Sequence, residues 1–332
     1  MGPASLDSFL KKMHCMGLHG LLLEEKMKDI NKVAILGAGA MGSFFAARFF
    51  DAPGFSTSLI ARGERGRRLA SDGLIVNGKN HAVPVSHPDQ VDTPADLIIV
   101  ALKHHHLPEA TGDLKNLVGE NTTIISVMNG LDSEPYIGSI YGTDKILYAV
   151  SVGIDALREG NRVSYSKPGT HFFGEAVNET PSERVMRVRK AFDRAGIVCE
   201  SPTDMIRIMW WKFMINVGMN QASAVMGAPY GVFQTSPEAR AVMESLMREV
   251  IALAQPAGVN LVEKDLEEWD KVLRTLSPVG KTSMLQDMEA GRKTEVEIFG
   301  GKVVALSRQY NIPTPVNETL LHIIKVMEKQ KI

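Results

Sequence analysis

A glycine-rich turn between an apolar run and a helical segment constrains the fold of this chain more than any other feature. The run Val33–Leu36 is short and apolar, as expected of a buried parallel strand, and Ser43–Phe50 has the composition of a helix. The turn between them has the spacing G-x-G-x-x-G. This strand–turn–helix pattern predicts a dinucleotide-binding domain, and the alternative is a turn of the same shape that binds no ligand.

Each glycine of the turn has a separate predicted role. Gly37 allows the tight turn, Gly39 lets the backbone approach a pyrophosphate, and Gly42 lets the helix pack closely on the strand. The amide groups at the start of the helix, at Ala40 and Met41, would face the pyrophosphate, assisted by the helix dipole.

Length and composition limit the classes of protein to which this chain can belong. Its 332 residues favour two domains, and 37 basic against 38 acidic residues create no strong field that would attract nucleic acid or an anionic membrane. No apolar run reaches the about 18 residues that a membrane span requires, so we expect a soluble, cytoplasmic protein. Cys15 and Cys199 form neither a disulfide framework nor a metal motif. Residues 1–30 lack the apolar core of a signal peptide and are expected to form an extension outside the fold.

The residue after the second predicted strand bears on the choice of cofactor. Phe55–Ala61 has the pattern of a strand and is followed by Arg62, about 20 residues beyond the last glycine of the turn, where this fold contacts the adenosine ribose. An acidic residue there would bind the 2′-hydroxyl of NAD, whereas an arginine accommodates the 2′-phosphate of NADP. The charged residues that follow are Glu64, Arg65, Arg67 and Arg68. The pattern favours NADP, and the alternative is a solvated basic start of a helix.

Two further strand ends place polar residues toward the same crevice. Leu97–Leu102 and Thr122–Met128 are apolar runs followed by Lys103 and Asn129, and ligands bind outside the carboxyl ends of parallel strands. The consecutive histidines 104–106 point in different directions and do not form a chelating set, so no metal site is predicted.

The rest of the first domain is expected to extend this sheet. Gly73–Val85 is predicted to be a hairpin with Asn77-Gly78 as its turn. An antiparallel extension of the parallel sheet is predicted to comprise Ile146–Ile154, Arg162–Tyr165 and Gly169–Gly174. A charged helix is predicted at Ser182–Ala195, and a last strand at Ile197–Glu200. We therefore assign residues 31–203 to a Rossmann-type domain and residues 204–332 to an all-helical domain.

A polar stripe marks the first helix of the second domain. Met205–Met226 is apolar almost all round and should be one buried helix, yet Lys212, Asn216 and Asn220 recur four residues apart on one face. Burying these groups is costly unless they find partners, so the stripe either forms hydrogen bonds between helices or lines a ligand cleft.

A second polar segment follows near the end of the chain. Ser283 and Asp287 are expected to share one helix face, with Glu295 about three turns beyond Ser283. The amphipathic segments Ile298–Tyr310 and Thr319–Met327 are predicted to be helices that close the domain.

In their order and spacing, these motifs resemble those of the ketopantoate reductase family over about residues 31–326. The segments that carry the resemblance are Gly37–Gly42, Leu102-Lys103, Asn129-Gly130, Trp211-Lys212 with Asn216 and Asn220, Ser283–Asp287 and Thr294-Glu295. The resemblance implies that NADPH reduces 2-dehydropantoate to (R)-pantoate, on the route to pantothenate and coenzyme A. A homodimer is expected on the same ground.

The resemblance also implies roles for single residues. Lys212 would be the general acid that protonates the alkoxide. Glu295 would hold the substrate hydroxyl beside the cofactor, while Asn216, Asn220 and Ser283 would bind polar groups of the substrate, including its carboxylate. Lys103 and Asn129 would line the cofactor and the cleft, and Arg62 would bind the 2′-phosphate.

Three alternatives remain open. The histidine run and Leu131-Asp132 depart from the family pattern near the expected substrate entrance, which leaves room for another 2-oxo acid as substrate. A β-hydroxyacid dehydrogenase would also combine a Rossmann domain with a Lys-x-x-x-Asn stripe, but its Asp-x-x-x-Ser-Gly-Gly segment is not found in this sequence. A non-catalytic NADP sensor is the alternative of a different class.

Overall fold

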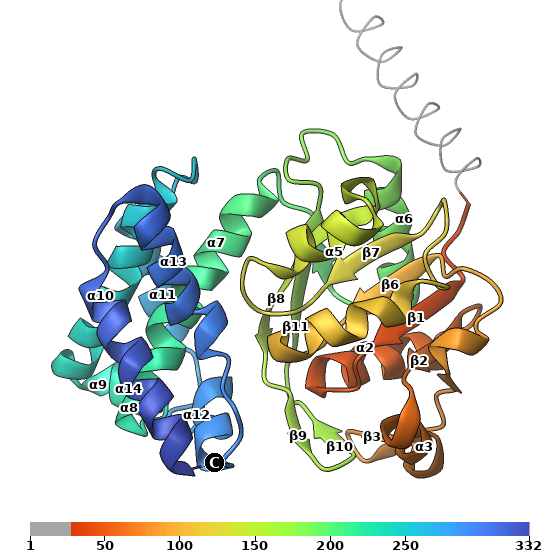
Figure 1. Ribbon diagram of the computed structural model, residues 1–332, viewed down its shortest axis with the longest axis horizontal. Coiled ribbons are helices and arrows are strands. Elements are labelled where there is room, and N and C mark those ends of the chain that lie inside the picture. Colours follow the sequence, from red (N-terminus) through yellow and green to blue (C-terminus); the bar gives the residue numbers. More distant parts are fainter. Residues whose placement is uncertain (1–27, 332) are drawn as a thin grey trace, which may run out of the picture.

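The computed structural model describes residues 28–331, which form a sheet-containing domain and a helical domain side by side (Figure 1). Most of the predicted N-terminal extension, including Cys15, lies outside the described residues. Within residues 28–30, however, Ile30 is buried in the core of the first domain, and the backbone carbonyl of Lys28 accepts a hydrogen bond of 2.7 Å from Arg187 Nε. The first domain therefore includes residues 28–30, which the sequence had assigned to the extension.

The first domain is built on an eight-stranded sheet with the order β12-β11-β8-β7-β6-β1-β2-β5. Its strands are β1 (Lys32–Leu36), β2 (Ser56–Ile60), β5 (Val85–Ser86), β6 (Leu97–Val100), β7 (Thr123–Ser126), β8 (Ile146–Ile154), β11 (Pro168–Gly174) and β12 (Cys199–Glu200). The strands from β8 to β5 are parallel, and β11 pairs with β8 in antiparallel fashion. The predicted α/β class with a parallel sheet is confirmed.

Helices cover both faces of this sheet because its central strands are apolar on both sides. The helices are α2 (Ala40–Asp51), α3 (Gly63–Asp72), α4 (Leu107–Ala110), α5 (Ser133–Tyr141) and α6 (Glu183–Arg194). Along β1, Val33 and Ile35 pack in one core with α2 and α6, while Ala34 and Leu36 pack in another with α4 and α5. Short 3₁₀ turns are η1 (Pro88–Gln90), η2 (His104–His106), η3 (Thr111–Leu114) and η4 (Thr143–Lys145).

The glycine-rich turn between β1 and α2 has a steric reason for two of its three glycines. Gly37 has a φ of +108°, and a Cβ there would lie 2.4 Å from the carbonyl oxygen of Ala101. A Cβ on Gly42 would lie 1.8 Å from the carbonyl oxygen of Gly37. A Cβ on Gly39 would meet only the Ala101 oxygen, at 3.8 Å, so the space beside Gly39 is open to a ligand.

A second, four-stranded sheet has the order β4-β3-β10-β9, with β3 (Leu74–Val76), β4 (Lys79–His81), β9 (Leu157–Glu159) and β10 (Arg162–Ser164). The predicted hairpin with an Asn77-Gly78 turn is confirmed, with φ values of +47° and +80° at these residues. The assignment of Arg162–Tyr165 to the main sheet was wrong, because β10 pairs with β3 and β9 instead. Alternating apolar residues predict a strand but do not indicate which sheet edge it joins.

The second domain is entirely helical, as predicted. Its elements are α7 (Met205–Ile215), η5 (Asn216–Asn220), α8 (Gln221–Met226), α9 (Tyr230–Thr235), α10 (Pro237–Ala254), α11 (Lys264–Leu273), α12 (Ser283–Glu289), η6 (Val296–Ile298), α13 (Gly300–Tyr310) and α14 (Pro315–Lys331). The first turns of α7 pack on the main sheet through Met205 and Met209, which contact Val150 of β8. No helix within residues 28–331 is long and apolar enough to cross a bilayer.

One prediction about this domain needs detail and another was wrong. The helix predicted over Met205–Met226 is continuous, but its residues Asn216–Asn220 form η5, a π-helical segment between α7 and α8. Gly218 lies in this segment, and a Cβ there would come within 2.4 Å of Met247 Cγ, so α10 packs directly against its backbone. Helix α12 ends at Glu289, so Glu295 lies not on the helix of Ser283 but in the turn that precedes η6.

Substitution of Gly42 tests the steric account of the turn. We expect Gly42→Ala to lower the free energy of unfolding by about 1–3 kcal/mol or more, because the new Cβ would overlap a backbone oxygen that cannot rotate away. The measurement is urea unfolding followed by circular dichroism. Gly112→Ala is the matched control, since its Cβ would meet no atom within 4 Å, and equal stability of the two variants would contradict the account.

Candidate active site

Polar side chains from both domains meet where β6 and β7 end opposite helix α7. Asn220 Nδ2 donates to Asn216 Oδ1 at 3.2 Å, and Asn216 Nδ2 donates to Asn129 Oδ1 at 3.4 Å. Asn129 Nδ2 in turn donates to Glu295 Oε2 at 3.1 Å. This row of three amides and one carboxylate, which we call the amide chain, crosses from the helical domain to the sheet domain and back.

Glu295 is held at the end of the amide chain by a second contact. The backbone amide of His104, just beyond β6, donates to Glu295 Oε1 at 3.4 Å. Burial raises the pKa of Glu295, whereas the bond from Asn129 and the charge of Lys103 oppose this rise. The carboxyl group is therefore fixed by donors from both strand ends.

Lys103 forms an ion pair with Asp287, a residue for which the sequence predicted no role. Its Nζ donates to Asp287 Oδ2 at 2.5 Å, and Arg292 Nε donates to Asp287 Oδ1 at 2.9 Å. The Asp287 side chain is buried, so two cations share one carboxylate at the boundary between the domains. Asp287 thus positions Lys103 beside the amide chain.

Lys212 differs from the other charged residues of the site because its ammonium group is partly buried without a partner among the described residues. Burial lowers the pKa of its ammonium to about 8, and within the described part of the chain the ammonium has no hydrogen-bond or ion-pair partner. Lys212 lines a cavity of about 10 Å³ with Asn129, Asn216 and Phe213, which is room for about one water molecule. An unpaired ammonium beside fixed amides can donate a proton to a ligand.

Within residues 28–331, two predicted site residues form no hydrogen bond with the amide chain or with Lys212. Ser283 is exposed at the start of α12, where Thr282 caps the helix, and its hydroxyl forms no hydrogen bond within residues 28–331. Arg62 follows β2 as predicted, but it forms ion pairs with Asp113 at 2.5 Å and with Asp89 at 3.5 Å.

The histidine run forms the 3₁₀ turn η2 next to Lys103. Burial lowers the pKa of His105, and the nearby positive charges of His106 and Lys293 lower it further. Across residues 28–331, no group of three or more His, Cys, Asp or Glu side chains could hold a metal ion.

The contacts of Asp287 and of the His104 amide were not predicted. The position of Asp287, one turn after Ser283, was visible in the sequence, but its contact with Lys103 joins residues 184 positions apart. No local signal identifies a backbone donor such as the His104 amide, because its role depends on where Glu295 lies.

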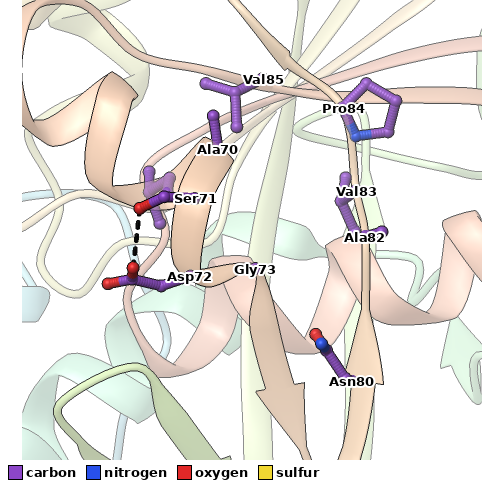
Figure 2. Close-up of a pocket in the computed structure, with 10 residues that line it drawn as sticks. Ala70, Ser71, Asp72, Gly73, Asn80, Ala82, Val83, Pro84 and Val85 are labelled. Atoms are coloured by element: carbon purple, nitrogen blue, oxygen red, sulfur yellow. Dashed lines mark hydrogen bonds between the residues drawn. The ribbon is translucent and has the colours of Figure 1, made fainter.

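A larger cavity of about 280 Å³ lies elsewhere, between the end of α3 and the segment from β4 to β5 (Figure 2). It is lined by Leu69–Gly73, Asn80 and Ala82–Val85. Its single carboxylate, Asp72, accepts a hydrogen bond of 2.7 Å from Ser71. None of the predicted site residues lines it, so we assign it no part in the chemistry.

The chain matches two family models that together span both domains. Residues 33–178 match the model "Ketopantoate reductase PanE/ApbA", and residues 204–328 match "Ketopantoate reductase PanE/ApbA C terminal". The interval between the two matches contains α6 and ends one residue before Asp204, the N-cap of α7.

Curated proteins and solved structures resemble the chain over most of its length. The chain is 25% identical to a 2-dehydropantoate 2-reductase of Aquifex aeolicus over 90% of this chain and 97% of the relative. A D-mandelate dehydrogenase with NADH and anilino(oxo)acetate superposes with a TM-score of 0.83 at 20% identity, covering 90% of this chain and 99% of its own. A dimeric ketopantoate reductase from Staphylococcus aureus superposes with a TM-score of 0.75 at 22% identity, with the same coverage.

The shared carboxylate provides a test of the domain boundary. We expect Asp287→Asn to lower the free energy of unfolding by about 1–3 kcal/mol, because the change removes charge-assisted bonds to Lys103 and Arg292. Glu289→Gln on the same helix is the control, since its exposed pair with Lys281 should contribute about 0–1 kcal/mol. Chemical denaturation of both variants measures the difference, and a loss no larger in Asp287→Asn than in Glu289→Gln would contradict the assignment.

Proposed function

Since the chain belongs to the ketopantoate reductase family, which is a family of dinucleotide-dependent oxidoreductases, we propose that it reduces 2-dehydropantoate to (R)-pantoate with NADPH. This reaction would place it in the synthesis of pantothenate and coenzyme A. The observation that carries the proposal is the unpaired, partly buried ammonium of Lys212 beside Asn129 and Asn216.

The glycine-rich turn fits the cofactor because the space beside Gly39 is open while Gly37 and Gly42 are closed off by backbone. When bound, NADPH supplies the hydride that reduces the keto carbon. Gly37–Gly42 would hold the pyrophosphate at the start of α2, and Lys103 and Asn129 would line the cleft at the ends of β6 and β7. Arg62 would contact the ribose end of the cofactor.

Lys212 acts as the proton donor in this proposal. Reduction of a ketone places negative charge on its oxygen, and an ammonium in a partly buried site stabilises this charge and then protonates the oxygen. A pKa of about 8 keeps most of Lys212 protonated at neutral pH while making the proton easier to release than that of an exposed lysine.

The amide chain would bind and orient the substrate. Glu295 accepts hydrogen bonds in the structure and would accept one from the substrate hydroxyl as well. Asn216 and Asn220 would donate to polar groups of the substrate, including its carboxylate, and Ser283 would join them. The side chains of Asn220, Asn216 and Asn129 are held in place by hydrogen bonds to one another, so they would need little rearrangement when substrate enters.

A second candidate function is reduction of a different 2-oxo acid. The fold similarity to D-mandelate dehydrogenase supports it, as does the histidine run η2 next to Lys103.

A homodimer is also proposed, and the dimeric reductase from Staphylococcus aureus supports it. Light scattering coupled to size exclusion tests the dimer, and a monomer at micromolar concentration would exclude it.

Turnover assays separate the candidate functions. We expect NADPH oxidation at 340 nm to be fastest with 2-dehydropantoate in a panel that includes pyruvate and benzoylformate, and to be slower with NADH. Faster turnover of another 2-oxo acid would change the substrate and retain the chemistry. Binding of NADPH without turnover of any substrate would favour the sensor.

Lys212→Ala tests the proton donor. We expect kcat to fall by about 10²–10⁴-fold, because the alkoxide loses its acid, while NADPH binding is retained. Lys281→Ala, an exposed lysine paired with Glu289, is the control and should leave kcat unchanged.

The pH dependence gives an independent measure of the same group. The protonated fraction of Lys212 falls as the pH rises through about 8, so kcat for reduction should decline above this pH in the wild-type protein. A pH-independent kcat between pH 6 and 10 would contradict the role of Lys212.

A further inference from the structure

Three arginines from two separate segments influence one another electrostatically, and one of them contacts the glycine-rich turn. Arg65 and Arg68 lie on α3, and Arg158 lies on β9 of the second sheet. We call these three residues the arginine cluster. Figure 1 shows β9, β10, β3 and α3 along the same end of the sheet domain.

The second sheet explains how Arg158 reaches the turn. Strand β10 is parallel to β3 with Val163 beside Val76, and β9 pairs with β10 so that Arg158 is opposite Val163. Asn161, between β9 and β10, adds a bond of 3.4 Å from its Nδ2 to the carbonyl oxygen of Asp72 at the end of α3. The β9–β10 hairpin is therefore fixed to the segment that follows α3.

Arg158 itself contacts the glycine-rich turn. Its Nη1 donates to the carbonyl oxygen of Ala38, which lies between Gly37 and Gly39, and its Nε donates to the carbonyl oxygen of Gly160 at 2.8 Å. This places a guanidinium group against the glycine-rich turn, at the residue that precedes Gly39.

The cluster carries positive charge without a protein counter-ion. Among the side chains that the structure describes, none of the three guanidinium groups forms an ion pair with a carboxylate, although Glu64 and Glu159 are neighbours in sequence. The pKa of Arg158 is lowered by burial and by the charges of Arg65 and Arg68, and that of Arg65 is lowered by burial and by Arg68. Guanidinium groups that repel one another and lack a carboxylate partner favour binding of an anion.

Arg62 cannot supply this charge alone. It forms ion pairs with Asp113 and Asp89, and one arginine with two aspartates has a net charge of −1. A phosphate dianion at this end of the sheet therefore requires further cations, and the arginine cluster provides them.

We propose that Arg65, Arg68 and Arg158 bind a phosphate group of the dinucleotide, with Arg158 closing over the glycine-rich turn from the second sheet. The inference rests on the proposed cofactor and extends it to a segment outside the Rossmann sheet. The arginine cluster could bind either of two phosphate groups, namely the pyrophosphate, which is common to both dinucleotides, and the 2′-phosphate, which is present only in NADPH. Arginine suits either because its planar donors pair with two phosphate oxygens at once.

Dissociation constants for NADPH, NADH and 2′,5′-ADP, measured by isothermal titration calorimetry, test the cluster. We expect Arg158→Gln and Arg65→Gln each to weaken NADPH binding by at least about tenfold, since each loses a charge-assisted bond to phosphate. Arg158→Lys keeps the charge and should recover part of this loss. Arg67→Gln changes an arginine of the same helix that is not among the charges lowering the pKa of Arg65 or Arg158, so it is the control and should bind like the wild type.

The three ligands separate the two phosphates. A loss for NADPH and 2′,5′-ADP with unchanged NADH binding identifies the 2′-phosphate, and an equal loss for both dinucleotides identifies the pyrophosphate. Unchanged NADPH binding in both Arg158→Gln and Arg65→Gln overturns the cluster while leaving the proposed function intact. If the wild-type protein binds neither dinucleotide, both the cluster and the proposed function fail. Arg65→Gln keeps the test valid if Arg158→Gln disturbs the hairpin.

Discussion

The site depends on an ammonium group that is partly buried without a carboxylate beside it. Burial of an unpaired charge is unfavourable, and for Lys212 the consequence is a pKa lowered to about 8. The neighbouring charges are already committed elsewhere, because Lys103 is paired with Asp287 and Glu295 is bonded to Asn129 and to the His104 amide. The ammonium of Lys212 therefore has no carboxylate partner within the described part of the chain.

Local steric and packing rules made the sheet domain predictable. The conformations required of Gly37 and of Asn77-Gly78 depend on a few neighbouring residues, and both turns were predicted from the sequence. The positions of Lys103 and Asn129 followed from a general property of parallel sheets, whose carboxyl ends meet at one edge. The alternation of apolar residues also located the strands, but it could not assign β10 to the second sheet, since that choice depends on a partner far away in sequence.

The parts of the site that the sequence did not reveal depend on contacts between distant segments. The π-helical segment η5 forms where α10 packs against Gly218, and a helical repeat of polar residues gives no sign of it. The partners of Lys103 and of Arg158 are likewise set by how the second domain and the second sheet are placed. Residue types along the chain thus indicated what chemistry was available, whereas the three-dimensional arrangement determined which groups remain free to carry it out.

The amide chain has a direction, because the Nδ2 group of each asparagine donates a hydrogen bond to a side-chain oxygen of the next residue. The last acceptor in the row is Glu295. Its members come from both domains, with Asn129 of the sheet domain between Asn216 and Glu295 of the helical domain, so neither domain produced separately would contain the complete row. A chimaera that combines this sheet domain with another protein's helical domain would need a donor where Asn216 approaches Asn129 and a carboxylate at the position of Glu295. Exchange of domains between such proteins is therefore limited by the polarity of one row of hydrogen bonds as well as by the shape of the surfaces.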